Sequence, residues 1–298
     1  MRQLNHILLR MGHLLMGLIL LAIALNLSAA TLDDIKARGE LIVGVKKDVP
    51  LWGMLDAQTG DIKGFEPDLA RLIAEKLGVK LKLVGVLTSE RTDAVLQRKV
   101  DLLIATLSDT PERRQAMTLV LPHYYASGVN LIARKSEHFK SWTDIRNRRI
   151  CGRRGAFYNR MITVQYGADI VALYANDLAA AALRDGRCSA WLYDDIAIIA
   201  MLKDPVWSVD FEMPMNSILH VPWSMALAPQ ERGGSFERLL SNLLIDWHRT
   251  GLLKKIEAQW GIPSTQYLDD MHSVWRRKEG TNWFCGDAIT ATTPKECQ

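Results

Sequence analysis

Apolar residues beyond residue 30 alternate between short continuous runs and longer segments with helical spacing. Residues 41–46 (LIVGVK) form a run typical of a buried strand. Residues 64–78 place Leu69, Leu72 and Ile73 on one helical face, with Pro67 in the first turn and a glycine at the end. The expected order is strand 41–46, helix 64–78, strand 81–86, helix 89–99 and strand 101–105. This βαβαβ order predicts a parallel sheet covered by helices.

The same order of elements recurs after an aromatic, apolar stretch at residues 121–135. The second copy is expected to contain strands 148–152, 170–174 and 189–194 and helices 157–166, 177–185 and 195–203. We therefore predict two lobes with similar topology. The extended residues 221–229 would carry the chain back, and helices at 236–249 and 251–260 would complete the first lobe.

The segment boundaries follow from this order. The expected division is an export signal at 1–30, lobe one at 31–124 plus 224–268, lobe two at 128–220, hinge crossovers at 125–127 and 221–223, and a tail at 269–298. The residues after Gly261 show no hydrophobic period, so we expect them to cover the surface without regular structure.

The first thirty residues have the order of a secretory signal peptide. Arg2 and Arg10 precede a nearly continuous apolar stretch at residues 14–27, and small residues follow up to Ala30. The stretch is shorter than the roughly 20 residues that span a membrane. We expect cleavage after Ala30 and a periplasmic location, with an uncleaved membrane anchor as the alternative.

Composition excludes several classes of partner and cofactor. Without the two signal arginines, 35 of the 37 basic residues remain against 33 acidic residues. This balance argues against nucleic acid as a partner. No metal or other cofactor is expected, and we predict a monomer.

The four cysteines are Cys151, Cys188, Cys285 and Cys297. Export and an even number favour disulfides, and the absence of a C-x-x-C pair argues against zinc. Cys285 and Cys297 enclose a short loop and are expected to pair. Buried free thiols are the alternative for all four.

The segment ATLSDTPERR at residues 105–114 joins a strand to a helix. Thr110 and Pro111 have the order of an N-cap followed by the first helical position. Arg113 then lies in the first turn, where a cation opposes the helix dipole unless an anion binds beside it. We therefore interpret Arg113 as a carboxylate ligand, with a surface pair to Asp109 or Glu112 as the alternative.

These segments resemble the family 3 extracellular solute-binding proteins of polar amino-acid transporters. The matching pieces include GELIVGVKKDVPLW at 39–52, GFEPDLARLIAEKLG at 64–78, KVDLLIATLSDTPERR at 99–114, DGRCSAWLYDD at 185–195 and TGLLKKIEAQWG at 250–261. The resemblance implies an α/β, two-lobed periplasmic-binding-protein fold (type II-like) with two hinge crossovers. It also implies capture of an amino-acid-like solute in the cleft and delivery to the membrane permease of an ABC transporter.

The resemblance implies specific ligand contacts. Arg113 would hold the ligand α-carboxylate, with Thr106 and Ser108 beside it, and Asp194 would receive the α-ammonium group. Asp195 is interpreted as the N-cap of the next helix, although the order of the two aspartates leaves either facing the ligand. Arg91 matches an arginine that acidic-amino-acid binders use for a side-chain carboxylate. Lys46 and Trp52 are placed to wall the pocket, or else are a strand-end cation and a core indole.

One segment departs from the family pattern. At RRGAFYNR the expected glycine is present as Gly155, but Ala156 replaces the usual threonine and has no hydroxyl. Phe157, Tyr158 and Asn159 could instead offer stacking and an amide. The ligand could therefore be an unusual amino acid, a small carboxylate or an aromatic compound. In this fold Cys151 and Cys188 would begin neighbouring strands, which favours a disulfide within lobe two.

Signals for catalysis are few. The chain has no G-x-S-x-G, phosphate-loop or H-E-x-x-H motif, so we expect a binding protein and not an enzyme. An exported dehydratase or lyase on the same fold is the alternative, with Glu66 and Glu90 as the candidate acids. A ligand-sensing or accessory protein is a further alternative. His123 is interpreted as structural or as lining the cleft, and His248 as a solvated helix residue.

Overall fold

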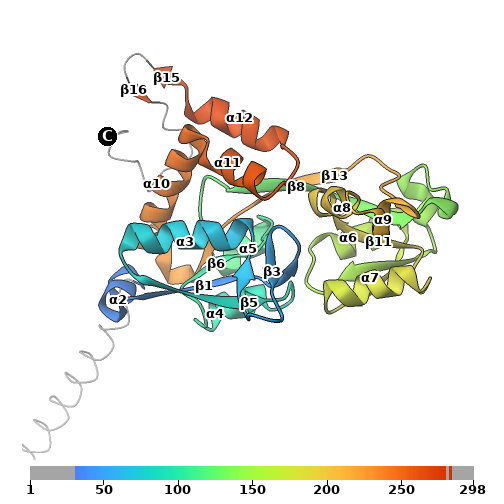
Figure 1. The fold of residues 1–298 in the computed structure, drawn as a ribbon, viewed down its shortest axis with the longest axis horizontal. Coiled ribbons are helices and arrows are strands. Elements are labelled where there is room, and N and C mark those ends of the chain that lie inside the picture. The colour runs from blue at the N-terminus through green and yellow to red at the C-terminus, as the bar shows by residue number, and fades with distance from the viewer. Residues whose placement is uncertain (1–30, 280–281, 284–298) are drawn as a thin grey trace, which may run out of the picture.

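The computed structural model describes residues 31–279 and 282–283 as two α/β lobes joined by two long strands (Figure 1). The predicted signal at residues 1–30 and the predicted Cys285–Cys297 pair lie outside the described residues. Among the residues described, no helix is both long and apolar enough to cross a membrane.

Lobe one is built on a five-stranded mixed sheet. Its strands, in spatial order, are β5 (Lys80–Val86), β1 (Glu40–Lys46), β6 (Leu102–Ile104), β14 (Ala226–Leu227) and β7 (Thr118–Leu119). β1 pairs in parallel with both β5 and β6, as the sequence predicted, and β14 is antiparallel to β6. A small sheet of β2 (Asp48–Val49), β3 (Gly53–Leu55) and β4 (Ile62–Lys63), which the sequence pattern did not predict, follows β1.

Helix α3 (Phe65–Leu77) shows how the predicted signals work. Phe65, Leu69 and Ile73 are fully buried against the sheet. Gly78 ends the helix with a φ of 68°, a left-handed conformation that glycine adopts at low cost. The predicted face and the predicted end of this helix are both confirmed.

The remaining lobe-one helices surround the same sheet. They are α2 (Thr31–Arg38), α4 (Arg91–Leu96), α5 (Pro111–Ala116), α10 (Ser235–Thr250), α11 (Leu252–Gln259) and α12 (Gln266–Trp275). The expectation of irregular structure after Gly261 is wrong for α12. Leu268 and Trp275 are buried, and this helix lies beside α10 (Figure 1). A short hairpin of β15 (Lys278–Glu279) and β16 (Asn282–Trp283) follows.

Lobe two repeats the parallel core of lobe one. Its sheet has the order β10 (Asp169–Leu173), β9 (Arg149–Arg153), β11 (Ala190–Asp194), β8 (Tyr125–Arg134) and β12 (Phe211–Glu212), and β13 (Ile218–Trp223) also pairs with β8. β9 is parallel to β10 and β11, whereas β8 is antiparallel to β11. The helices are α6 (Tyr158–Tyr166), α7 (Asn176–Arg184), α8 (Asp195–Met201) and α9 (Pro205–Ser208), with 3-10 turns η1 (Lys135–Glu137) and η2 (Trp142–Ile145).

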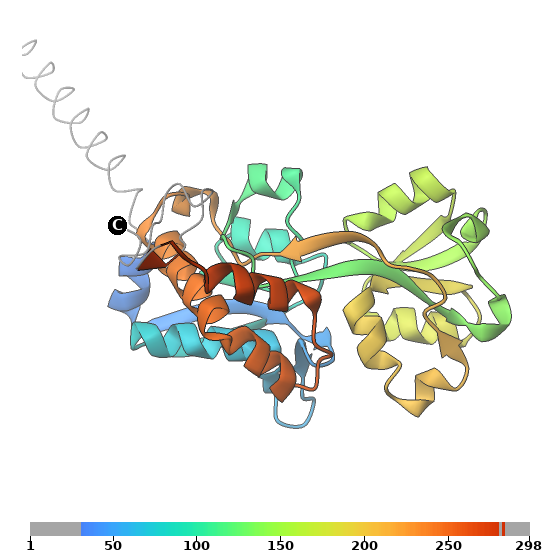
Figure 2. The same cartoon turned by 90° about the horizontal axis from the view of Figure 1, so that it is seen from above.

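Strands β8 and β13 form the connection between the lobes. They run side by side from one lobe to the other (Figure 2), with Tyr125 opposite Trp223 and Ser127 opposite Val221. Both crossovers therefore lie in one antiparallel ribbon, which can bend or twist as a unit.

An aromatic cluster anchors the lobe-one end of this ribbon. The Trp52 ring lies 4.4 Å from Tyr125 and 4.8 Å from Trp223, measured between ring centroids, with edge-on geometry in both pairs. The Tyr125 hydroxyl donates to Glu257 Oε1 at 2.6 Å. Such packed aromatic pairs contribute about 0.5–1.5 kcal/mol each beyond burial, so both crossovers are fixed firmly in lobe one.

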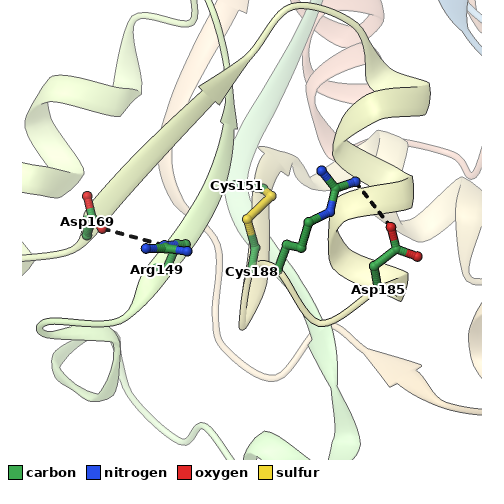
Figure 3. The surroundings of a disulfide bond; sticks show 6 residues. Arg149, Cys151, Asp169, Asp185 and Cys188 are labelled. Carbon is green, nitrogen blue, oxygen red and sulfur yellow. Dashed lines mark hydrogen bonds and ion pairs between the residues drawn. A yellow bond between two sulfur atoms is a disulfide. The ribbon is translucent and has the colours of Figure 1, made fainter.

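The predicted disulfide within lobe two is confirmed. Cys151 and Cys188 are joined with a Cα–Cα distance of 5.6 Å. Cys151 lies in β9 and Cys188 lies just before β11 (Figure 3), so the bond links two neighbouring strands of one sheet. Both cysteines are buried, and the pairs Arg149–Asp169 and Arg187–Asp185 lie around them.

Candidate functional site

A small polar cavity lies between the two lobes at the carboxyl ends of their strands. Its volume of about 10 Å³ is room for about one water molecule. Its lining comes from both lobes: Thr88, Arg91, Thr106, Ser108, Arg153, Ala156, Phe157, Tyr158, Tyr193 and Asp194. The lobes therefore meet closely at this cavity, and a solute larger than water needs them to separate here. A larger pocket of about 670 Å³ lies between the same lobes beside Asp48 and Asn176.

Arg113 is not among the residues that line this cavity, but it contacts Ser108, which is, and Gly155, next to the lining residue Ala156. Thr110 accepts a hydrogen bond from the Arg113 amide and Pro111 begins α5, as predicted from the sequence. The guanidinium donates to Ser108 O at 2.6 Å and to Gly155 O of lobe two at 3.4 Å. Burial, together with the Arg91 cation, lowers the pKa of Arg113 to about 9.

The predicted alternative for Arg113, a surface ion pair, is not what the structure contains. Asp109 instead pairs with Arg114 and with His123. The Arg113 side chain is half-buried and directed at the lobe interface, where its charge is met by two carbonyl oxygens.

Arg91 is buried at the start of α4 and, within the part of the chain that the structure describes, donates only to main-chain carbonyls. Its guanidinium donates to Thr88 O at 3.0 Å, to Ala105 O at 3.0 Å and to Thr106 O at 2.6 Å, with a longer contact of 3.5 Å to Gly155 O. Burial lowers its pKa. The cation therefore lines the cavity without a direct carboxylate partner.

The Thr106 carbonyl that accepts from Arg91 belongs to a residue with a strained backbone. Its φ of 46° is left-handed, which is uncommon for a β-branched residue and typical of functional sites. The Thr106 amide donates to Glu66 Oε1 at 2.5 Å and to the Tyr124 hydroxyl at 3.1 Å. Glu66 is fully buried and does not line the cavity, so its observed contacts support the loop that carries Thr106.

Asp194 faces the cavity and Asp195 does not. Asp194 ends β11, and burial raises its pKa to about 7 against the opposing effect of Arg91. Asp195 instead accepts from Ser127 Oγ at 2.8 Å and from the Gly128 amide at 2.9 Å. The interpretation of Asp195 as the N-cap is wrong, because α8 begins at Asp195 and Asp194 holds the cap position.

The loop at Gly155 brings lobe two to within contact of lobe one. Gly155 has a φ of 82°, and an added Cβ would lie 2.9 Å from Ser89 Cα. Only glycine permits both this backbone and this approach. Ala156 and Phe157 follow it in the cavity wall, where the methyl side chain of Ala156 offers no hydrogen bond.

Lys46 and Trp52 do not line the cavity. Lys46 is fully buried and donates to Thr88 Oγ1 at 3.0 Å, with Asp48 Oδ1 at 2.8 Å. Burial lowers its pKa to about 8. Trp52 belongs to the lobe-one core, so the structure matches the alternative of a core indole.

Three cavity residues were missed by sequence reasoning: Thr88, Arg153 and Tyr193. Arg153 and Tyr193 had a usable signal, because each comes at or next to the end of a buried parallel strand, where ligand sites gather. Tyr158, which begins a helix after the Gly155 loop, was named beside Phe157 and lines the cavity.

The two histidines and Glu90 lie away from the cavity. His123 Nε2 contacts Asp109 at 2.6 Å, which fits a structural role. The prediction that His248 is solvated is wrong, because it is 1% exposed and bonds to His123 O at 2.7 Å. Glu90 accepts from the Tyr174 hydroxyl at 2.6 Å at the surface.

No group of three or more His, Cys, Asp or Glu side chains within the described ranges could hold a metal ion. The chemistry of the cavity is instead that of fixed charges. Arg91 of lobe one and Asp194 of lobe two both line the cavity.

The profile of the bacterial extracellular solute-binding proteins, family 3, matches residues 41–263. The chain belongs to this family. The matched range includes both lobes, both crossovers and every residue that lines the cavity of this solute-binding protein.

Relatives of this solute-binding protein include named amino-acid binders. A glutamine-binding protein of Geobacillus stearothermophilus is 33% identical over 119 residues, which cover 39% of this chain and 45% of that protein. The L-cystine-binding protein TcyJ of Escherichia coli is 24% identical over 262 residues, covering 83% of this chain and 94% of the relative. The chain spans about half the length of the first curated relatives it matches.

Solved structures share the fold at lower identity. A cysteine-binding protein from Campylobacter jejuni superposes with a TM-score of 0.71 at 24% identity, covering 78% of this chain and 92% of that one. The ancestral amino-acid-binding protein AncCDT-1, a precursor of cyclohexadienyl dehydratase, gives a TM-score of 0.68 at 23% identity, covering 78% and 99%. The two-lobed fold is therefore that of solute-binding proteins.

Proposed function

We propose that this protein captures an amino acid, or a small amino-acid-like carboxylate, between its lobes for uptake by an ABC transporter. The observation that carries the proposal is the meeting of Arg113 with the Gly155 loop at a cavity lined by Asp194. A zwitterionic amino acid has a carboxylate that can pair with Arg113 and an ammonium group that can pair with Asp194.

The α-carboxylate would bind Arg113 in place of the carbonyls that the guanidinium now contacts. Arginine presents a planar fork of donors that suits a carboxylate, and such charge-assisted bonds are about twice as strong as neutral ones. The Ser108 hydroxyl is available beside it. Because α5 has only six residues, the guanidinium and not the helix dipole supplies most of the attraction.

The α-ammonium group would bind Asp194 from the opposite lobe. Ligand binding then favours the closed arrangement by the difference in affinity between the open and closed states. Bending of the β8–β13 ribbon provides the motion. Contacts from both lobes couple capture to closure.

Export and delivery complete the proposal. The charge and apolar pattern of residues 1–30 supports transfer to the periplasm. Relatives named as ABC-transporter binding proteins support a membrane permease as the partner. The protein itself would bind its ligand without catalysing a reaction, since Glu66 and Glu90, the candidate acids of an enzyme, lie outside the cavity lining.

A thermal-shift screen of the mature protein tests the proposal. The panel would contain the proteinogenic L-amino acids, matched small carboxylates without an amine, and amines without a carboxylate. We expect at least one amino acid to raise the melting temperature, since a ligand at about 100 times its Kd stabilises by about 2.7 kcal/mol. Stabilisation by none of the panel, with the protein shown to be folded, would contradict amino-acid capture.

A further inference from the structure

The inter-lobe site holds more basic than acidic side chains. Among the residues that line the cavity, two are basic, Arg91 and Arg153, and one is acidic, Asp194. Lys46 and Asp48 lie behind Thr88 and Arg153, and Arg113 lies beside Ser108. The lining therefore carries one more basic than acidic side chain.

Arg153 is the least explained of these cations. It ends β9 in lobe two, is fully buried, and crosses to lobe one, where Nη2 lies 2.9 Å from Asp48 Oδ2. Within lobe two it donates to Asn176 Oδ1 and to Tyr174 O. Its Nε has no hydrogen-bond partner among the described residues.

Asp48 is the carboxylate that two cations share. Lys46 Nζ lies 2.8 Å from its Oδ1, and Arg153 lies at its Oδ2. Both cations also reach Thr88 Oγ1, at 3.0 Å from Lys46 and 3.4 Å from Arg153. Thr88 lines the cavity, so the shared carboxylate lies immediately behind the cavity wall.

Burial of this surplus is costly without an anion. An ionised group removed from water needs a compensating charge, and main-chain carbonyls compensate only in part. Among the described residues, Arg91 and Arg113 donate to carbonyl oxygens alone. A single ligand carboxylate at Arg113 would leave the Lys46–Arg153 side of the site with one shared acid.

We propose that Arg153 and Lys46 form a second anion subsite, and that the protein selects an amino acid with an acidic side chain, such as L-glutamate or L-aspartate. The ligand side-chain carboxylate takes the place that Asp48 holds in the closed structure. The subsite rests on the proposed function, because it assumes that Arg113 and Asp194 orient the ligand backbone.

The competing explanation is a latch. In that case the Arg153–Asp48 pair only holds the lobes together, and its loss weakens every ligand alike. The two accounts differ in a measurable ratio, the affinity for an acidic amino acid relative to its amide.

Isothermal titration of the mature protein with L-glutamate, L-aspartate, L-glutamine and L-asparagine measures that ratio. We expect each acid to bind about 10-fold or more tightly than its amide, the effect of one charge-assisted bond. Arg153→Gln should lower the ratio of acid to amide affinity to about 1, whatever its effect on the amides themselves. Arg154→Gln is the matched control, since Arg154 is adjacent but exposed, and should change neither affinity.

Asp48→Asn tests the same point in the opposite direction. Removing the shared carboxylate frees two cations, so the acids should bind more tightly than to the wild type. A latch predicts weaker binding of all four ligands. This variant keeps the test decisive if Arg153→Gln does not fold.

Three results would overturn the subsite: amides binding as tightly as acids in the wild type, equal weakening of both classes by Arg153→Gln, or weaker acid binding by Asp48→Asn. Binding of amides without acids would leave amino-acid capture intact. Failure of every amino acid to bind would remove both proposals.

Discussion

Gly155 sets how closely the two lobes approach at the site. Its left-handed φ, and the 2.9 Å that would separate an added Cβ from Ser89 Cα, leave no room for a side chain. Arg91 and Arg113 both reach its carbonyl oxygen. The close approach of the two lobes therefore requires glycine at position 155.

Gly155→Ala should weaken ligand binding by about 10-fold or more, because strained backbone costs about 1–3 kcal/mol and the added methyl opposes closure. Titration of the screened ligand measures the effect. Gly186→Ala in the same lobe is a control with a similar φ of 70° but open space around its Cβ. Equal losses in both variants would show that the effect is not specific to closure.

His248 gives the protein a pH-dependent stability. Burial lowers its pKa to about 4 from 6.5, so the unfolded chain binds the proton first as the pH falls. The stability that the neutral form contributes is present above about 6.5 and is lost between 6.5 and 4, by at most about 1.4 kcal/mol per pH unit.

His248→Gln should remove this part of the acid sensitivity. Urea unfolding at pH 7 and pH 5, followed by tryptophan fluorescence, measures it. The raised pKa values of Asp194 and Glu66 act in the opposite direction, with stability lost as the pH rises towards 7. They are common to both proteins, so an unchanged pH dependence in the variant would contradict the assignment to His248.

At the residue scale, sequence reasoning succeeded where a local signal coincided with a chemical need. The helix-start signal led to Arg113 and the family resemblance to Asp194, and both lie where the two lobes meet. Lys46 and Trp52 were ambiguous, because a residue near a strand end can face a cavity or the core. Arg153 was missed because the spacing of residues along one strand does not reveal a partner 105 residues away in the other lobe.

At the scale of single helices and strands, the predicted element matched the observed one where the hydrophobic period agreed with the residues that begin or end it, as in α3. Helix α12 was missed because its buried residues Leu268 and Trp275 are few and its flanks are rich in turn residues. It is stabilised by tertiary contacts: His272 Nδ1 lies 2.7 Å from His248 O, and Tyr267 donates to His123 O at 3.1 Å. Such contacts override a weak local pattern.

The disulfide between β9 and the start of β11 should stabilise lobe two. The cysteines are separated by 37 positions, and closing a loop of that size corresponds to about 3–4 kcal/mol in the chain-entropy account. The double variant Cys151→Ser/Cys188→Ser should lower the unfolding temperature of lobe two. Ligand affinity should be retained, because neither cysteine lines the cavity; an unchanged unfolding temperature would contradict the stabilising role.

For the whole molecule, the repeated βαβαβ order was enough to predict two lobes and the edge of each sheet that carries the site. It could not predict how closely the lobes meet, because that distance depends on a few polar contacts. Arg153, Asp48 and Asn176 make several of these, including Asn176 Nδ2 to Asp48 O at 2.7 Å. Contacts of this kind are exchanged for water or ligand when the hinge opens.

The central claim is that one solute is held jointly by Arg113 of lobe one and Asp194 of lobe two. Isothermal titration at pH 8, where Asp194 is charged, would compare the wild type with Arg113→Ala, Asp194→Asn and the exposed neighbouring control Arg114→Ala. We predict single-site binding that falls by about 100-fold in Arg113→Ala and about 10-fold in Asp194→Asn, because each removes a charge-assisted contact, and stays unchanged in the control. Wild-type affinity in both site variants would contradict the account.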